Sequence, residues 1–113
     1  MRWVLRSKIH NATVTESNLN YIGSITIDKA LIEKAGFIPG EKVTVASTTT
    51  GARLETYIIE GKKNSGVIAM NGPAAHIIKA GEHVVIMAFE LASKKIKPKV
   101  ILVDEHNRFL RQL

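Results

Sequence analysis

The chain has 113 residues, no cysteine, and 16 basic against 10 acidic side chains, for a net charge of +6. This length suffices for one domain with a hydrophobic core, and the lack of cysteine excludes disulfides, thiolate metal sites and a cysteine nucleophile. The longest apolar run, Val84 to Phe89, is too short to cross a bilayer. Charge interrupts the start MRWVLRSKIH before a signal-peptide core could form. We therefore expect a soluble, cytoplasmic protein with no membrane partner.

Strand signals dominate the chain, and two short helices interrupt them. The first helix, DKALIEKAG, has Asp28 as its N-terminal cap and Gly36 as its end. The second, GPAAHIIKAG, has Pro73 in its first turn and Gly81 just past its end. The sequence predicts one mainly β domain over residues 1–113. Runs rich in Val, Ile and Thr predict strands at 24–27, 42–47, 53–59, 66–70, 83–89 and 99–104.

An internal echo links two parts of the chain. PGEKVTV at 39–45 and AGEHVVI at 80–86 share Gly-Glu-x-Val, each after a predicted helix, with an offset of 41 residues. The echo suggests two similar halves of a closed β structure, because closure removes the edges that many short strands would expose. We expect a small barrel.

The positive charge makes nucleic acid a partner to consider. The basic residues are scattered from Arg2 to Arg111, and the one cluster, KKIKPK at 94–99, is typical of a solvated approach to an edge strand. Six aromatic residues offer few platforms for base stacking. We expect no nucleic acid partner, but a small basic barrel that binds nucleic acid is the alternative to an enzyme.

No familiar cofactor or metal motif is present. The four histidines lack metal-ligand spacing, and there is no phosphate-binding or dinucleotide-binding glycine loop. The Gly23-Ser24 pair within NYIGSITID is unusual, because glycine weakens a strand and serine prefers local hydrogen bonds. Seven other polar residues have two possible interpretations: their side chains face water, or they line a common site. Asn71 and the glycine after it could also form a plain turn. The seven residues are Lys8, His10, Tyr21, Arg53, Thr56, Tyr57 and Asn71.

The order of SKIH, ATVT, NYIGSITID, GARLETY and NGPAA resembles that of the aspartate 1-decarboxylases. These pyruvoyl-dependent enzymes make β-alanine for pantothenate and coenzyme A. The resemblance runs from about Leu5 to Asp104. Whether the tail, residues 105–113, is ordered or flexible is left open. It implies a six-stranded double-psi β-barrel with short helices, and a homotetramer with active sites between subunits.

The resemblance implies that Gly23 and Ser24 make the cofactor. The Ser24 hydroxyl attacks the Gly23 carbonyl and converts the amide into an ester; elimination then breaks the chain, and loss of ammonia leaves a pyruvoyl group on residue 24. The fragments are 1–23 and 24–113. Glycine leaves the carbonyl open to attack. The ketone forms a Schiff base with aspartate and acts as an electron sink, so neither metal nor pyridoxal phosphate is expected.

Further roles follow from the same resemblance. Arg53 holds a substrate carboxylate with its two-pronged donor set, and Lys8 adds a charge for the second carboxylate of L-aspartate. Tyr57 returns a proton to the α carbon after carbon dioxide leaves. Thr56 binds substrate and, in the precursor, donates to the Gly23 carbonyl oxygen as it gathers charge.

The remaining family positions form the pocket wall. His10, Tyr21 and Asn71 line it, and the backbone amides of Gly72 and Ala74 help to bind a carboxylate at the helix start.

This chain departs from the family pattern at two positions. Pro73 stands where relatives commonly have alanine and cannot donate a backbone hydrogen bond, and Ala46 stands where many have a bulkier residue. Thr56 and Tyr57 point to opposite faces of a regular strand, so both serve one site only if the strand bulges or the site spans two subunits. The sequence leaves open whether maturation needs an accessory protein, and whether the serine matures at all.

Overall fold

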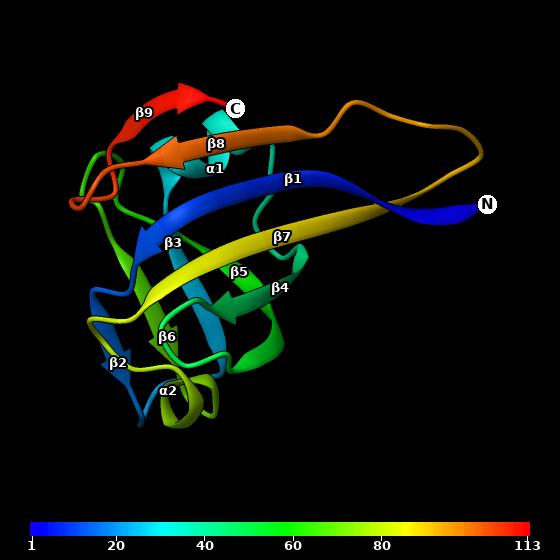
Figure 1. The fold of residues 1–113 in the computed structure, drawn as a ribbon. Helices are drawn as coiled ribbons and strands as arrows, with labels where there is room; N and C mark the ends of the chain where they lie inside the picture. The colour runs from blue at the N-terminus through cyan, green and yellow to red at the C-terminus, as the bar shows by residue number, and fades with distance from the viewer.

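The computed structural model describes all 113 residues and contains nine strands and two short helices (Figure 1). The prediction of a mainly β fold with short helices is confirmed. In chain order the elements are β1 (Arg2–Thr13), β2 (Glu16–Asn18), β3 (Ser24–Asp28), α1 (Lys29–Ala35), β4 (Lys42–Ser47), β5 (Arg53–Gly61), β6 (Ile68–Asn71), α2 (Ala74–Ile77), β7 (His83–Ala92), β8 (Lys99–Val103) and β9 (Phe109–Gln112).

The strands pair in the order β2-β6-β3-β5-β4-β7-β1-β8-β9. Three pairs are parallel, namely β1 with β8, β2 with β6 and β3 with β5, and the others are antiparallel. Figure 1 shows β1 and β7 side by side as a long ribbon that projects from the body of the molecule together with the connection between β7 and β8. Because the order has nine strands and two end strands, the predicted six-stranded closed barrel is not confirmed by the strand pairing.

The two helices differ in how well they match their predicted bounds. Asp28 caps α1 by accepting from the backbone N–H of Ala30, and Gly36 ends it in the left-handed conformation, as predicted. Helix α2 is one turn long and ends at Ile78, whose backbone is extended, rather than near Gly81. The predicted helix is too long because Ile78 turns its side chain into the core, where it is fully buried.

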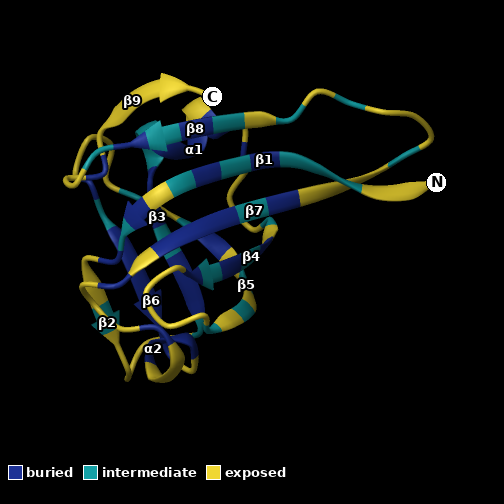
Figure 2. Cartoon of the chain, viewed as in Figure 1, coloured by how far each residue is buried: buried dark blue, intermediate teal, exposed yellow.

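The core consists of 22 buried apolar side chains contributed by β1, β3 to β8 and the segments between them. Alternate residues of β3 and β5, including Ile25, Ile27 and Ile58, point inward, and β6 is buried along its whole length (Figure 2). Each buried isoleucine contributes about 1.5–3 kcal/mol of hydrophobic free energy. The β3–β6 pair therefore holds the start of β3 rigidly.

The internal echo corresponds to a repeated turn before β4 and before β7. In each turn a glycine with positive φ donates to a carbonyl far away in the sequence, and the next residue, a glutamate, accepts from the backbone N–H three residues earlier. Strands β4 and β7 pair antiparallel, with Val45 opposite Ile86, which are also 41 residues apart. The two halves are thus related by an approximate twofold rotation. The turn residues are Ile38, Gly40, Glu41, Lys79, Gly81 and Glu82.

Strands β1 and β2 are separated by only two residues, and hydrogen bonds there join them to β6. The backbone N–H of Thr15 donates to the Ile68 carbonyl at 2.8 Å, and the Thr15 hydroxyl accepts from the Ile68 N–H at 3.0 Å. The buried amide of Asn107 donates to the carbonyls of Thr13 and Gly66, both at 2.8 Å. The end of β1 is therefore tied to the start of β6.

Candidate active site

Ser24 is fully buried at the first position of β3. Its hydroxyl accepts a hydrogen bond of 2.8 Å from Nδ2 of Asn71 and donates to the Ile22 carbonyl at 3.3 Å. Asn71, directly opposite Ser24 in the β3–β6 register, is itself 2% exposed. The structure therefore holds a serine hydroxyl in a fixed position beside the Gly23–Ser24 peptide.

Two residues that the sequence did not single out orient the Asn71 amide. Nδ2 of Asn71 also donates to the Thr26 hydroxyl at 2.9 Å, and Oδ1 accepts from Nδ2 of Asn18 at 3.2 Å. With both ends engaged, Asn71 presents its donor to Ser24 rather than its acceptor. Strand alternation could have indicated Thr26, which shares a face with Ser24. No pattern in the sequence indicates the contact of Asn18 with Asn71.

The turn after β6 packs directly against the backbone that precedes Ser24. Gly72 has a φ of 62°, and a Cβ there would lie 2.7 Å from the Tyr21 carbonyl oxygen and 2.9 Å from the Gly23 nitrogen. A Cβ on Gly23 would lie 3.2 Å from Cδ of Pro73. Glycine at both positions therefore permits the close approach of two backbone segments. Tyr21, Gly72 and Pro73 thus lie close to the backbone at Gly23, Asn71 contacts Ser24, and Ala74 follows Pro73 as the first residue of α2.

The backbone amides expected to bind a carboxylate differ in their availability. The N–H of Gly72 donates to the Asn18 carbonyl at 2.8 Å and is already engaged. Helix α2 is a single turn that begins after Pro73, which has no amide hydrogen. Its partial charge is correspondingly small.

Four of the predicted site residues lie apart from Ser24, on the outer face of the β5-β4-β7-β1 sheet. Strand pairing aligns Glu55, Thr44, Met87 and Lys8 across these four strands. Because side chains alternate along a strand, Arg53 and Tyr57 share the face of Glu55, and His10 shares the face of Lys8. None of these four side chains makes a hydrogen bond or an ion pair within the chain, so their polar groups are free for a partner or substrate. They are Lys8, His10, Arg53 and Tyr57.

Strand β5 is regular around the two residues whose joint use was in question. The β4–β5 register runs without a shift from Arg53 to Tyr57, with Tyr57 opposite Lys42 and Thr56 opposite Val43. Thr56 therefore points to the inner face and Tyr57, 40% exposed, to the outer face. The structure contains no bulge that would bring both side chains to one point of the same chain.

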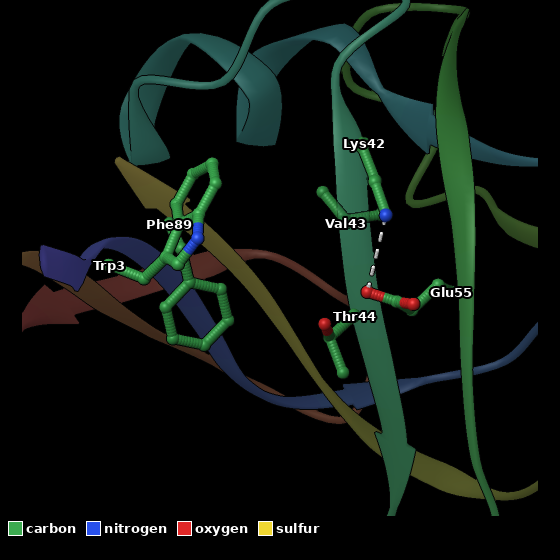
Figure 3. A pocket seen from close by; sticks show the side chains of 6 residues that line it. All are labelled: Trp3, Lys42, Val43, Thr44, Glu55 and Phe89. Carbon is green, nitrogen blue, oxygen red and sulfur yellow. Dashed lines mark ion pairs between the residues drawn. The ribbon is translucent and has the colours of Figure 1, made fainter. Parts of the chain in front are cut away.

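A groove of about 500 Å³ lies on this outer face and not beside Ser24. Figure 3 shows the rings of Trp3 and Phe89 close together on one side, and the Lys42–Glu55 ion pair of 3.6 Å on the other. A smaller hollow that includes Arg53 shares Thr44 and Glu55 with this groove. The face that carries Arg53 is thus hollowed and partly apolar.

Three carboxyl groups with lowered pKa values lie outside the Ser24 surroundings. Hydrogen bonding and charge from Lys63 lower the pKa of Glu33, and the backbone N–H of Arg108 lowers that of Asp104. The third is Glu82, in the turn before β7. No cluster of three or more metal-ligating side chains occurs, and no helix has the length and apolar character needed to span a membrane.

These features define a small β protein with a buried serine at the start of a strand, preceded by a glycine and held by an asparagine. The model of the aspartate decarboxylase family matches residues 1–110. The aspartate 1-decarboxylase of Carboxydothermus hydrogenoformans is 48% identical, with 96% of this chain and 88% of the relative covered. That of Bacillus subtilis is 46% identical, with 99% and 91% covered, and that of Clostridium botulinum is 49% identical, with 92% and 87% covered.

The chain therefore belongs to the aspartate decarboxylase family, as its sequence motifs indicated.

Proposed function

We propose that the chain decarboxylates L-aspartate to β-alanine and carbon dioxide in the cytoplasm, for pantothenate synthesis, after cutting itself between Gly23 and Ser24. Membership of the family supports the reaction. The observation that carries the proposal is the buried Ser24 hydroxyl, held at 2.8 Å by Asn71 next to a glycine carbonyl. A solvated serine in a flexible loop would lack this preorganisation.

The strand pairing suits a break at this peptide bond. Residues from Ile25 onward pair with β5 and β6, so the new amino end of the larger fragment stays anchored. The smaller fragment contains β1 and β2, which pair with β7, β8 and β6 of the larger one. Both fragments therefore stay associated without a covalent link.

The surroundings of Ser24 fit a pyruvoyl group derived from it. The site is buried, and Asn71 offers a donor to an oxygen at this position. The ketone, when formed, supplies the electron sink that the twenty ordinary side chains lack. In the precursor, Thr56 is the proposed donor to the Gly23 carbonyl oxygen, where charge gathers during attack.

The free polar side chains of the outer face account for substrate recognition. Arg53 has no carboxylate partner, because the nearby Glu55 is paired with Lys42. The guanidinium can therefore take a substrate carboxylate with two parallel hydrogen bonds, while Lys8 offers a charge to the second carboxylate. Tyr57, on the same face, is the proposed proton donor to the α carbon.

We place each active site between two subunits of a homotetramer. In one chain, the predicted residues form two groups, one around Ser24 and one on the outer face, with no hydrogen bond between them. The regular β5 strand removes the alternative in which a bulge unites Thr56 and Tyr57. A second copy placed on the hollowed outer face would bring its own Ser24 to Arg53.

A double-psi barrel is part of this proposal. Counting β1 and β2 as one bent strand gives a ring of six, β1/β2-β7-β4-β5-β3-β6, whose seam is held by the Thr15–Ile68 and Asn107 hydrogen bonds. The approximate twofold relation of the turns before β4 and β7 supports the same interpretation.

Mass spectrometry of the denatured protein tests the proposal. We expect fragments of 23 and 90 residues, the larger one with a carbonyl-blocked amino end, and β-alanine formation from L-aspartate. The Ser24→Ala variant should keep the fold and lose both cleavage and carbon dioxide release. Ser17→Ala is the matched control, because Ser17 lies on β2, on the other side of β6, and its hydroxyl contacts only the Ala80 N–H.

A mature, active protein with an intact chain would refute the assignment. Uncleaved protein that binds DNA in a salt-sensitive way would favour the nucleic-acid alternative instead.

A further inference from the structure

Glu82 is a buried carboxylate that the proposed reaction does not use. Its side chain lies in the turn before β7, and the residue is only 9% exposed. Oε1 accepts from the hydroxyls of Ser47 at 2.6 Å and Thr50 at 3.3 Å, and Oε2 accepts from the backbone N–H of Lys79 at 2.7 Å. These bonds join the turn before β7 to the loop between β4 and β5.

The loop held by Glu82 leads directly into Arg53. The Ser47 hydroxyl accepts from the backbone N–H groups of Thr49 and Thr50 at 3.2 and 3.1 Å. The Thr50 hydroxyl accepts from the N–H of Ala52 at 3.2 Å, and the Ala52 carbonyl accepts from the Ser47 N–H at 2.8 Å. A continuous chain of hydrogen bonds thus connects the carboxylate to the residue before Arg53.

The contacts of Glu82 favour its charged form. Hydrogen bonding from Ser47, followed by that from the Lys79 backbone, lowers the pKa of Glu82 below its ordinary value. Hydrogen bonds to an ionised acceptor are shorter and stronger than neutral ones. At neutral pH the carboxylate therefore holds the loop firmly.

We propose that Glu82 is a positioning residue that sets the placement of Arg53 for a dicarboxylic amino acid substrate. This inference rests on the proposed role of Arg53. A guanidinium binds a carboxylate in a directional, two-pronged geometry, so the backbone that carries it must be held in place. Arg53 is the first residue of β5, and its own side chain makes no bond within the chain, so the preceding loop supplies the constraint.

Glu82→Gln removes the charge and keeps the shape. A glutamine accepts through one oxygen only, and in either orientation its amide group faces a donor, because the Ser47 hydroxyl already accepts two N–H groups. We expect KM for L-aspartate to rise about tenfold, since small misplacements of a binding group cost large factors. Self-cleavage at Ser24 should be unchanged, and kcat should stay within about twofold of the unmodified protein.

Glu41→Gln is the matched control. Glu41 occupies the equivalent position in the other turn, where it accepts from the Ile38 N–H and pairs with Arg6 at 2.5 Å, but it does not touch the loop before Arg53. This variant also loses an acceptor in a turn, so it reports the general cost of such a change. Its KM should stay within about twofold of the unmodified protein.

Arg53→Ala, alone and combined with Glu82→Gln, completes the test. If Glu82 acts through Arg53, the double variant should show no larger KM than Arg53→Ala alone. A raised KM in Arg53→Ala with an unchanged KM in Glu82→Gln would overturn this inference alone. An unchanged KM in Arg53→Ala would overturn the role of Arg53 and this inference with it.

Discussion

At the residue scale, the neighbours of Ser24 decide which of its lone pairs and protons are free. The hydroxyl proton is directed to the Ile22 carbonyl, and one lone pair accepts from Asn71. The donor at 2.8 Å fixes the orientation of this oxygen, which leaves its second lone pair for the proposed attack on the Gly23 carbonyl carbon. Because Asn18 donates to Oδ1 of Asn71 and Thr26 accepts from the same Nδ2, this donor cannot turn away without loss of two further hydrogen bonds.

A substitution at Gly72 tests whether the close packing of the backbone before Ser24 matters for self-cleavage. In Gly72→Ala the new Cβ would lie 2.7 Å from the Tyr21 carbonyl oxygen and 2.9 Å from the Gly23 nitrogen. The segment before Ser24 must shift, so we expect self-cleavage to slow by at least about tenfold, since near-attack geometry supplies much of the acceleration. The measurement is the uncleaved fraction over time by intact mass.

The control for this variant is Gly40→Ala. Gly40 also has a positive φ, 85°, but a Cβ there meets no atom within 4 Å. Both variants carry the left-handed backbone cost of about 1–2 kcal/mol, and only Gly72→Ala disturbs the Ser24 surroundings. Equal cleavage rates in the two would contradict the close-packing argument.

Sequence motifs indicated Ser24, Asn71 and Gly72 because each belongs to a short segment with a specific pattern. They could not indicate Asn18, since its contact to Asn71 spans 53 residues and depends on the parallel β2–β6 pairing. They also could not indicate that the Gly72 N–H is engaged by the Asn18 carbonyl. Partner choice in such contacts follows from the three-dimensional pairing of strands.

At the element scale, Asp28 links the end of β3 to helix α1 and to the loop before β6. Oδ1 accepts from the backbone N–H groups of Ala30 and Asn64, and Oδ2 accepts from that of Gly66, each at 2.8 Å. The residue is 1% exposed. The sequence predicted the cap of α1, but the two contacts to the loop before β6 required the fold.

Asp28→Asn tests this junction. The asparagine has one acceptor oxygen, so its amide must face a backbone donor at the other position. We expect a loss of about 2 kcal/mol in the free energy of unfolding, the cost of an unsatisfied buried group next to a lost charge-assisted hydrogen bond. Urea denaturation measures it. Glu60→Gln, an exposed change on β5, should shift the midpoint little; a similar shift in both variants would contradict the role of Asp28.

Among the elements, periodicity worked where strands are short and bounded by glycine or charge, as in β4, whose predicted bounds are those observed. It did not indicate the 12-residue β1, because charged residues interrupt its apolar pattern. That strand is solvated on one face and bulged at two places. The tail contributes β9, which pairs with β8 although all four of its residues are exposed.

At the scale of the whole molecule, the separation of Ser24 from Arg53 makes a prediction about mixed assemblies. If each active site takes its pyruvoyl group from one chain and its arginine from another, two different inactive variants should complement each other. Ser24→Ala supplies the Arg53 face but no pyruvoyl group, whereas Arg53→Ala can mature but binds aspartate weakly. Each variant alone should show little activity at low substrate concentration.

Co-expression of the two variants with different affinity tags, followed by tandem purification, yields the mixed species. With random assembly in a symmetric oligomer, about a quarter of the sites should combine an intact Ser24 with an intact Arg53. We expect a matching share of the unmodified activity, measured as β-alanine formed per site at low aspartate concentration. Mixed assemblies that are no more active than the sum of the separate variants would show that one chain supplies both residues, because a site within one chain gains nothing from a neighbour.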